Sequence, residues 1–317
     1  MLSAAPTLSL SGLRTAGGDA KLTADGNLTL EEQTNLGQGD LFVDVAGDVT
    51  QLATGTITAR GLGLMVDGTT VLTNAGNDVD EIAAETDGVI VFTDVDDLRV
   101  GTVTVDAVMA NLAMGGVISS SEMDLVGVTT SNDDVKLTAE GNLTFEQQAN
   151  LGQGDLFVDV AGNVSQTAAV VANGLGLMVD GATTLTNAGN DVDIIAADNG
   201  GELVFVDVDG LTVGSITVDG MTVSGIDTKT GDVKLTTGAD LMINQVITAG
   251  SITPSNLFLN VAGNVTQTAA VVANGLGLMV DGTTTLTNAG NDVDIICLLY
   301  TSPSPRDQRG SRMPSSA

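Results

Sequence analysis

Pairs of aspartates two residues apart are the residues of this sequence whose type and spacing could support chemistry. In a β-strand, such a pair places two carboxylates on one face, about 6–7 Å apart. This spacing is near the lower limit for an inverting glycosidase, and the oxygens could also contribute to a calcium site. The pairs are Asp78/Asp80, Asp191/Asp193, Asp207/Asp209 and Asp292/Asp294.

Other observations favour a structural interpretation of these pairs. Three of them recur with a long sequence repeat, whereas an active site is normally built once. The chain has no histidine and a single cysteine, which excludes histidine-based nucleophilic catalysis and ordinary zinc sites. Gly76–Asp80 resembles part of a calcium-binding nonapeptide repeat but lacks its leading glycines and nine-residue spacing. We therefore expect that the protein is not an enzyme and that it binds no cofactor. The pairs are interpreted as solvated acidic turns, with Asp78, Asp80, Asp191, Asp193, Asp292 and Asp294 kept as calcium candidates.

Three phenylalanines occupy one position of the repeat: Phe42, Phe157 and Phe258. Phe157 alternates in phase with Asp159 and out of phase with the flanking apolar residues, so the rings are expected to face outward. One interpretation is a stacking platform for sugar rings or a protein partner, with Phe157 and Phe258 on one face about 24 Å apart, five strand spacings along the axis. The other is an outer aromatic that a loop of a neighbouring coil covers.

The repeat organises the whole chain. Gly61–Asp80 returns almost unchanged as Gly174–Asp193 and again as Gly275–Asp294. We divide the continuous array of residues 1–296 into a partial unit 1–60, full units 61–173 and 174–274, and a partial unit 275–296. A segment of different composition, 297–317, follows the array.

Within a unit, the pattern predicts an all-β protein. Runs such as Leu156–Val160 alternate branched apolar with polar residues, and Gly, Asn and Asp clusters separate the runs. Because only 2% of residues are aromatic, the interior must be thin and aliphatic. We predict a parallel β-solenoid of roughly 15 coils of about 20 residues, about 70 Å long. Tandem β-sandwich modules are the alternative. Leu98–Asp133 exceeds its counterpart Leu211–Gly231 by an enlarged loop or most of a coil.

Several motifs carry a resemblance to a known family. GDLFVDVAGNVSQ (Gly154–Gln166), GLGLMVDG, LTNAGNDVD and DVKLTAEGNLTF resemble the repeats of filamentous-haemagglutinin-type proteins, which are large exported adhesins of Gram-negative bacteria. The resemblance covers about residues 11–296. It implies a right-handed parallel β-helix that serves as a stalk or adhesive shaft, secreted or on the bacterial cell surface. The expected partners are glycans or proteins of other cells, or neighbouring copies, bound weakly and multivalently. A β-helical polysaccharide lyase or glycosidase is the alternative function.

The net charge and the two ends of the sequence bear on the partners and the location of the protein. A net charge of −30 disfavours binding to nucleic acid or to anionic lipid, and no apolar run is long enough to insert in a membrane. The N-terminus lacks a signal peptide pattern, so an export signal is expected outside this sequence. Cys297–Ala317 resembles a translated sequencing adapter, and we interpret it as a non-native or disordered tail that forms no coil.

Overall fold

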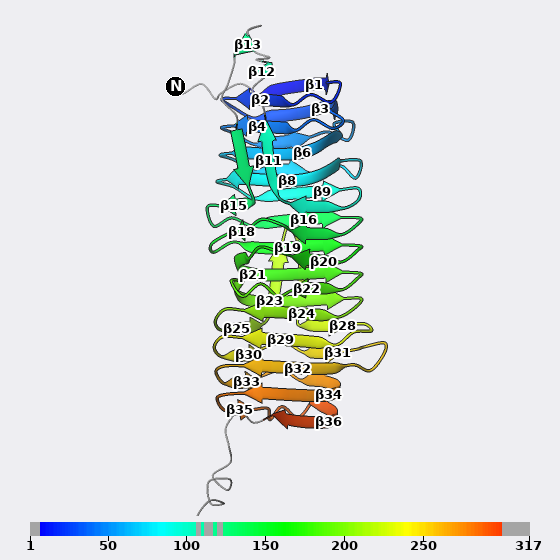
Figure 1. The fold of residues 1–317 in the computed structure, drawn as a ribbon, viewed down its shortest axis with the longest axis vertical. Helices are drawn as coiled ribbons and strands as arrows, with labels where there is room; N and C mark the ends of the chain where they lie inside the picture. The colour runs from blue at the N-terminus through cyan, green and yellow to red at the C-terminus, as the bar shows by residue number, and fades with distance from the viewer. Residues whose placement is uncertain (1–6, 106–108, 111–116, 119–122, 300–317) are drawn as a thin grey trace, which may run out of the picture.

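The computed structural model describes residues 7–105, 109–110, 117–118 and 123–299. These described residues contain no helix, and 61% of the residues lie in strands that form a β-solenoid of about 13 turns of ~21 residues (Figure 1). The strands on successive turns pair in parallel, for example β2 with β4 and β4 with β6. The predicted parallel solenoid is confirmed, and the alternative of tandem sandwich modules is wrong.

Apart from β11–β14 and β26–β27, which leave the stack, the strands follow one another along the axis in chain order. The first part of the stack contains β1 (Leu8–Arg14), β2 (Ala20–Ala24), β3 (Leu28–Asn35), β4 (Leu41–Val45), β5 (Val49–Gln51), β6 (Ile57–Val66), β7 (Thr70–Leu72), β8 (Asp78–Thr86), β9 (Ile90–Asp94), β10 (Leu98–Val100), β11 (Thr102–Val105), β12 (Met109–Ala110), β13 (Val117–Ile118), β14 (Met123–Val126) and β15 (Val128–Thr130). The middle contains β16 (Val135–Ala139), β17 (Leu143–Phe145), β18 (Ala149–Asn150), β19 (Asp155–Val160), β20 (Val164–Gln166), β21 (Val170–Val179), β22 (Thr183–Leu185), β23 (Asp191–Asn199), β24 (Leu203–Asp207), β25 (Leu211–Val213), β26 (Ser215–Val218), β27 (Met221–Ser224) and β28 (Ile226–Thr228). The last part contains β29 (Val233–Thr237), β30 (Leu241–Ile243), β31 (Ile247–Ala249), β32 (Asn256–Val261), β33 (Val265–Gln267), β34 (Val271–Val280), β35 (Thr284–Thr285) and β36 (Asp292–Leu299).

One largely aliphatic core, which also contains Phe92, Phe145 and Phe205, fills the inside of the stack from end to end. Inward residues lie above one another, as in the ladder of Leu22, Val43, Leu64 and Ala84, all buried. Branched side chains fit such a pleated, repeated layer. The boundaries between repeat units fall inside the long strands β6, β21 and β34, so the units are not separate domains.

An asparagine of the repeated NAGND motif is buried inside the coil rather than exposed on a turn. The Asn190 side chain donates hydrogen bonds to the carbonyl of Val206 and to Gln166 Oε1, at 3.0 and 2.8 Å. Its Oδ1 accepts from Val170 N at 2.9 Å. Asn77 makes the equivalent contacts in the first copy. The motif therefore satisfies backbone groups at a corner, because unpaired buried polar groups are costly.

Two antiparallel hairpins leave the stack. β11 pairs with β14 and β26 pairs with β27; the second turns at Asp219–Gly220, both at positive φ as in a type I′ turn. Each hairpin interrupts a strand: β25 and β28 continue along the two halves of β23. The extra residues of Leu98–Asp133 thus belong to a longer hairpin excursion, part of which lies outside the described residues. Because hairpin residues add no turns, the stack has about 13 turns instead of the predicted 15.

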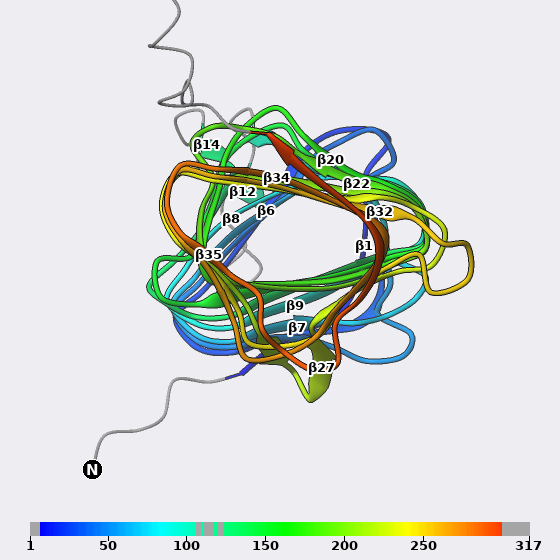
Figure 2. The same ribbon diagram turned by 90° about the horizontal axis from the view of Figure 1, so that it is seen from below.

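The repeat does not contain a whole number of turns. β19 continues the ladder β9–β16–β19–β21–β23, whereas its counterpart β32 continues β22–β24–β29–β32. Successive units are therefore rotated about the axis relative to one another. In the view along the axis, β14 and β27 lie on different sides of the stack (Figure 2).

The end of the repeat differs from the prediction. Cys297, Leu298 and Leu299 continue β36 in parallel register with Gly277, Leu278 and Met279. The expectation that the segment from Cys297 takes no part in a coil is wrong for these three residues, because their backbone extends the ladder. Residues 300–317 lie outside the described part. No helix of the described residues is long and apolar enough to cross a bilayer.

Candidate functional site

The aspartate pairs at the start of long strands lie on the outer surface. Asp78/Asp80 in β8 and Asp191/Asp193 in β23 are exposed on either side of a buried valine, as strand alternation requires. Asp292 and Asp294 in β36 are also exposed. Although Asp78 is exposed, partial loss of solvent around its carboxyl, followed by the nearby charges of Asp96 and Asp80, raises the pKa of Asp78. Among the described residues, no group of three or more acidic, histidine or cysteine side chains could hold a metal.

Asp207 and Asp209 do not form the open pair that a glycosidase would need. Asp207 is 3% exposed, and its two carboxylate oxygens accept from Val192 N at 2.9 Å and from Asp209 N at 3.2 Å. Asp94 makes the equivalent bonds in the preceding repeat. Burial raises the pKa of Asp207 to about 7, although its two backbone hydrogen bonds oppose the shift. This carboxyl therefore closes a backbone corner and does not face a substrate.

Two of the three repeated phenylalanines are packed rather than available for stacking. Phe42 and Phe157 point outward from the coil as predicted, but both are 0% exposed. A different hairpin covers each ring. Phe42 packs with Val103, Val105 and Leu125 of the first hairpin, and Phe157 packs with Ile216, Val218 and Val223 of the second. The proposed ligand-stacking role is therefore wrong for Phe42 and Phe157, and the alternative of a covering loop is confirmed for both.

Phe258 lies apart from that arrangement. It is partly exposed, and no hairpin side chain is among the atoms nearest to Gly277, over which its ring lies. The expectation that Phe157 and Phe258 share one face is also wrong, because β19 and β32 belong to different ladders. A straight row of aromatic rings along the shaft does not exist.

A polar groove lies on the outer face of β16, β19, β21 and β23, beside the turn that carries Lys229. Its volume is about 360 Å³, and its charged lining residues are Glu140, Asp159, Asp180, Asp198 and Lys229. Asp159, Met178, Asp198 and Asp227 succeed one another along the parallel ladder. The groove therefore carries four carboxylates and a single ammonium group in its lining.

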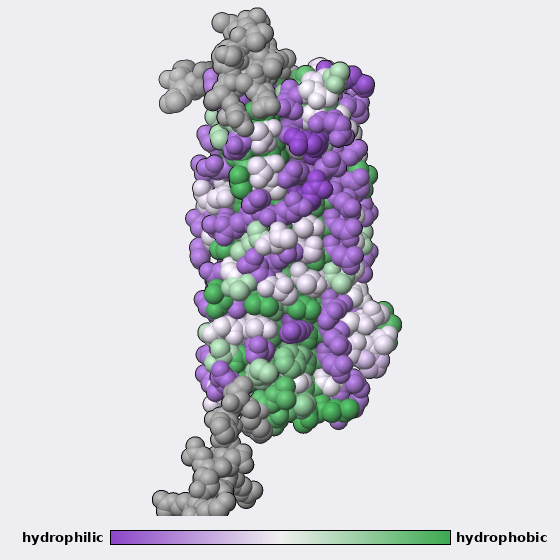
Figure 3. Space-filling view, viewed as in Figure 1, coloured by the Kyte–Doolittle hydropathy of each residue, from purple (hydrophilic) through white to green (hydrophobic). Residues whose placement is uncertain are grey.

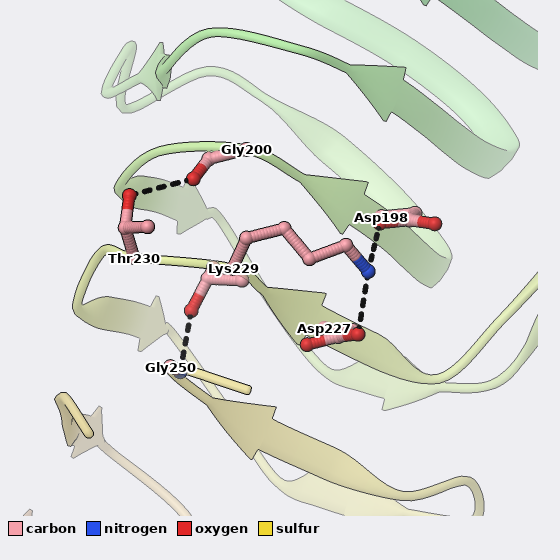
Figure 4. Close-up of polar contacts among 7 residues, drawn as sticks. Asp198, Gly200, Asp227, Lys229, Thr230 and Gly250 are labelled. Atoms are coloured by element: carbon pink, nitrogen blue, oxygen red, sulfur yellow. Dashed lines mark hydrogen bonds and ion pairs between the residues drawn. The ribbon is translucent and has the colours of Figure 1, made fainter. Parts of the chain in front are cut away.

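Lys229 closes one end of this groove. Its Nζ lies 2.7 Å from Asp198 Oδ1 and 2.6 Å from Asp227 Oδ2 (Figure 4). Hydrogen bonds to Asp198 and Asp227 raise the pKa of Lys229, so the amine stays charged and is unsuited to act as a base. All three side chains are at least one-third exposed, and such pairs contribute little to stability.

Asp159 is the carboxyl of the groove whose pKa is shifted from its ordinary value. Burial raises its pKa, the charge of Lys136 opposes this shift, and Glu140 and Asp180 add to it. The set of acceptor oxygens suits hydroxyl donors of a neutral glycan or a cationic group, whereas a polyuronate would be repelled. The sequence contained one signal for this site: Lys229 is among few basic residues, and it follows Asp227 at strand spacing.

Comparison with protein-family models, with curated protein sequences and with solved structures finds no match to this chain.

Proposed function

We propose that this chain is part of a rigid structural and adhesive shaft of a secreted or surface-exposed bacterial protein of the filamentous-haemagglutinin type. The observation that supports this most is continuity: one hydrophobic core runs through about 13 turns, and the repeat boundaries fall inside strands. A stack in which each turn rests on the next holds distant surface groups at fixed spacing. Such spacing is what multivalent binding through weak contacts requires.

The contacts in this proposal are polar. Since Phe42 and Phe157 are covered, we assign the contacts to the groove lined by Asp159, Asp180 and Asp198. Its carboxylates would accept hydrogen bonds from sugar hydroxyls or from basic groups on a protein surface. The net charge of −30 directs such binding toward neutral or basic partners and away from anionic ones.

Adhesion of protein-coated beads tests this function. Beads carrying many copies should adhere to neutral polymeric glycans or to cells, while the corresponding monosaccharides compete poorly. Asp180→Asn with Asp198→Asn should lower adhesion several-fold, whereas the exposed Asp193→Asn should leave it unchanged. Absence of adhesion to neutral glycans, basic surfaces and cells alike would contradict the adhesive part of the proposal.

The carboxylates of the groove also support a second candidate function, hydrolysis of a neutral polysaccharide by a glycosidase. Asp159, with its raised pKa, would be the acid, and a second groove carboxylate the base. Incubation with neutral polysaccharides should then release new reducing ends, and Asp159→Asn should abolish this release. If the adhesive proposal is correct, bound polymer is instead recovered at its original length.

A further inference from the structure

The three repeats supply an internal comparison of one surface, which we name the aromatic platform. In each copy it consists of a lysine, a phenylalanine, a glycine and a small residue on four successive strands of one ladder. The three sets are Lys21, Phe42, Gly63 and Ala83; Lys136, Phe157, Gly176 and Ala196; and Lys234, Phe258, Gly277 and Cys297.

A hairpin covers the first two platforms. In the second copy, β26 runs across β19, β21 and β23, and its Ile216 and Val218 pack on Phe157. In the first copy, Val103, Val105 and Leu125 pack on Phe42 in the same way. Figure 1 shows β11 lying along the axis and crossing the strands of the stack. The covered ring is 0% exposed in both copies.

Glycines make room for both the ring and the hairpin. A Cβ atom added at Gly176 would lie 2.9 Å from Phe157 Cδ2 and 3.1 Å from Ile216 Cγ2. At Gly277, the three nearest atoms all belong to Phe258. At Gly174 the space is taken by Ile216 and Asp155, whereas at Gly275 the nearest atoms all belong to Asn256. The third platform thus keeps the glycines, while the aliphatic side chains that fill the space beside them are missing.

Charge gives a second indication of what fits there. Lys136 Nζ lies 3.5 Å from Asp219 Oδ2, in the turn of the covering hairpin. Lys234 holds the same place beside Phe258, is exposed, and has no ion pair within the described part of the chain. Ile295, Ile296, Leu298 and Leu299 of β36 are exposed at the end of the described stack (Figure 3), where no described strand pairs with the far edge of β36.

We propose that the platform of Lys234, Phe258 and Gly277 is a docking site for an antiparallel β-hairpin with an aliphatic face and an acidic turn. The hairpin would lie along the axis as β26–β27 does, with branched side chains over Phe258 and the glycines, and with its acidic turn on Lys234. The occupant is therefore a hairpin of the chemistry of Ser215–Ser224, in which Ile, Val and Val face the ring and Asp219 faces the lysine.

A cyclised peptide with the sequence Gly214–Gly225 is the probe, titrated into the full chain at low ionic strength. We expect saturable binding that Phe258→Ser reduces at least fivefold. Lys234→Glu should weaken binding about threefold to tenfold, as expected for reversal of a partly exposed ion pair. A peptide with Asp219→Lys should restore binding to the Lys234→Glu chain. Lys136→Glu, at a platform already covered, is the matched control and should leave peptide affinity unchanged.

Each other result overturns the proposal. Absence of saturable binding at millimolar peptide would mean that the platform does not accept a hairpin. Binding that persists in Phe258→Ser would place the peptide on the exposed aliphatic residues of β36. Binding that is insensitive to both charge reversals would exclude the alignment of the hairpin turn with Lys234. Circular dichroism of each variant checks that the solenoid is retained.

Discussion

Replacing Phe157 by Ser should lower the free energy of unfolding by about 3–5 kcal/mol, the usual cost of truncating a fully buried phenylalanine. The ring is 0% exposed and joins the outer face of the coil to the hairpin. Its loss leaves a cavity beneath Ile216, Val218 and Val223, so the hairpin should also detach. Denaturant melts give the stability, and hydrogen exchange of Ser215–Ser224 gives the hairpin. Both should change together.

Phe258→Ser is the matched control for this change. The residue holds the same position in the repeat, but no hairpin within the described part of the chain covers it, and it is partly exposed. Its replacement should cost less than about 1.5 kcal/mol, because less apolar area is lost from burial. If Phe157→Ser were as mild as Phe258→Ser, the ring of Phe157 would be solvated and the original interpretation as a ligand platform would return.

Stability should fall as the pH rises from 5 to 8. Burial raises the pKa of Asp94 and of Asp207 to about 7, from an ordinary value of 3.8. Between these values the folded chain keeps a proton that the unfolded chain has released, so folding is favoured at the lower pH. The contribution is complete below about pH 4 and is lost as the pH rises through 7. Each group contributes a slope of at most about 1.4 kcal/mol per pH unit within this window.

The double variant Asp94→Asn, Asp207→Asn isolates these two groups. It should be less stable overall, because the NH2 group of Asn replaces one carboxylate oxygen and cannot accept from a backbone N–H group, yet its stability should vary much less with pH. Thermal melts at pH 5, 6, 7 and 8 give the slope. The exposed Asp193→Asn should keep the slope of the parent chain. An unchanged slope in the double variant would assign the pH dependence to the general repulsion of a chain with a net charge of −30.

The fold could be predicted from the local sequence pattern because each coil repeats the same alternation of apolar and polar residues. Alternation in runs such as Leu156–Val160 sets which side chains face the core, and the low aromatic content sets its width. The outward direction of Phe157 followed from the same alternation. The hairpin that covers the ring of Phe157 could not be predicted, because Ser215–Ser224 has the same alternating pattern as a strand of the stack. Only the turn at Asp219–Gly220 marks it, and DG pairs also occur elsewhere in the chain.

The groove and the rotation of the units were missed for a different reason. Asp159, Asp198 and Lys229 meet because Asp159 and Asp198 lie on one ladder and Lys229 directly follows β28, the next strand of that ladder. The register of the ladder depends on how many residues each corner contains. The long strand β21 runs straight past a corner of the preceding coil, because β18 and β19, which lie on either side of that corner, both pair with β21. Such a change leaves no clear trace in composition, yet it moves Phe258 to another ladder than Phe157.

Small-angle scattering of the full chain distinguishes one continuous stack, which a shaft requires, from a string of separate modules. We expect the pair-distance distribution of a single rod with a constant cross-section. About 13 turns at ~4.8 Å per turn give an ordered length of about 60 Å. A distribution with the separate maxima of linked globular modules of about 100 residues would contradict it.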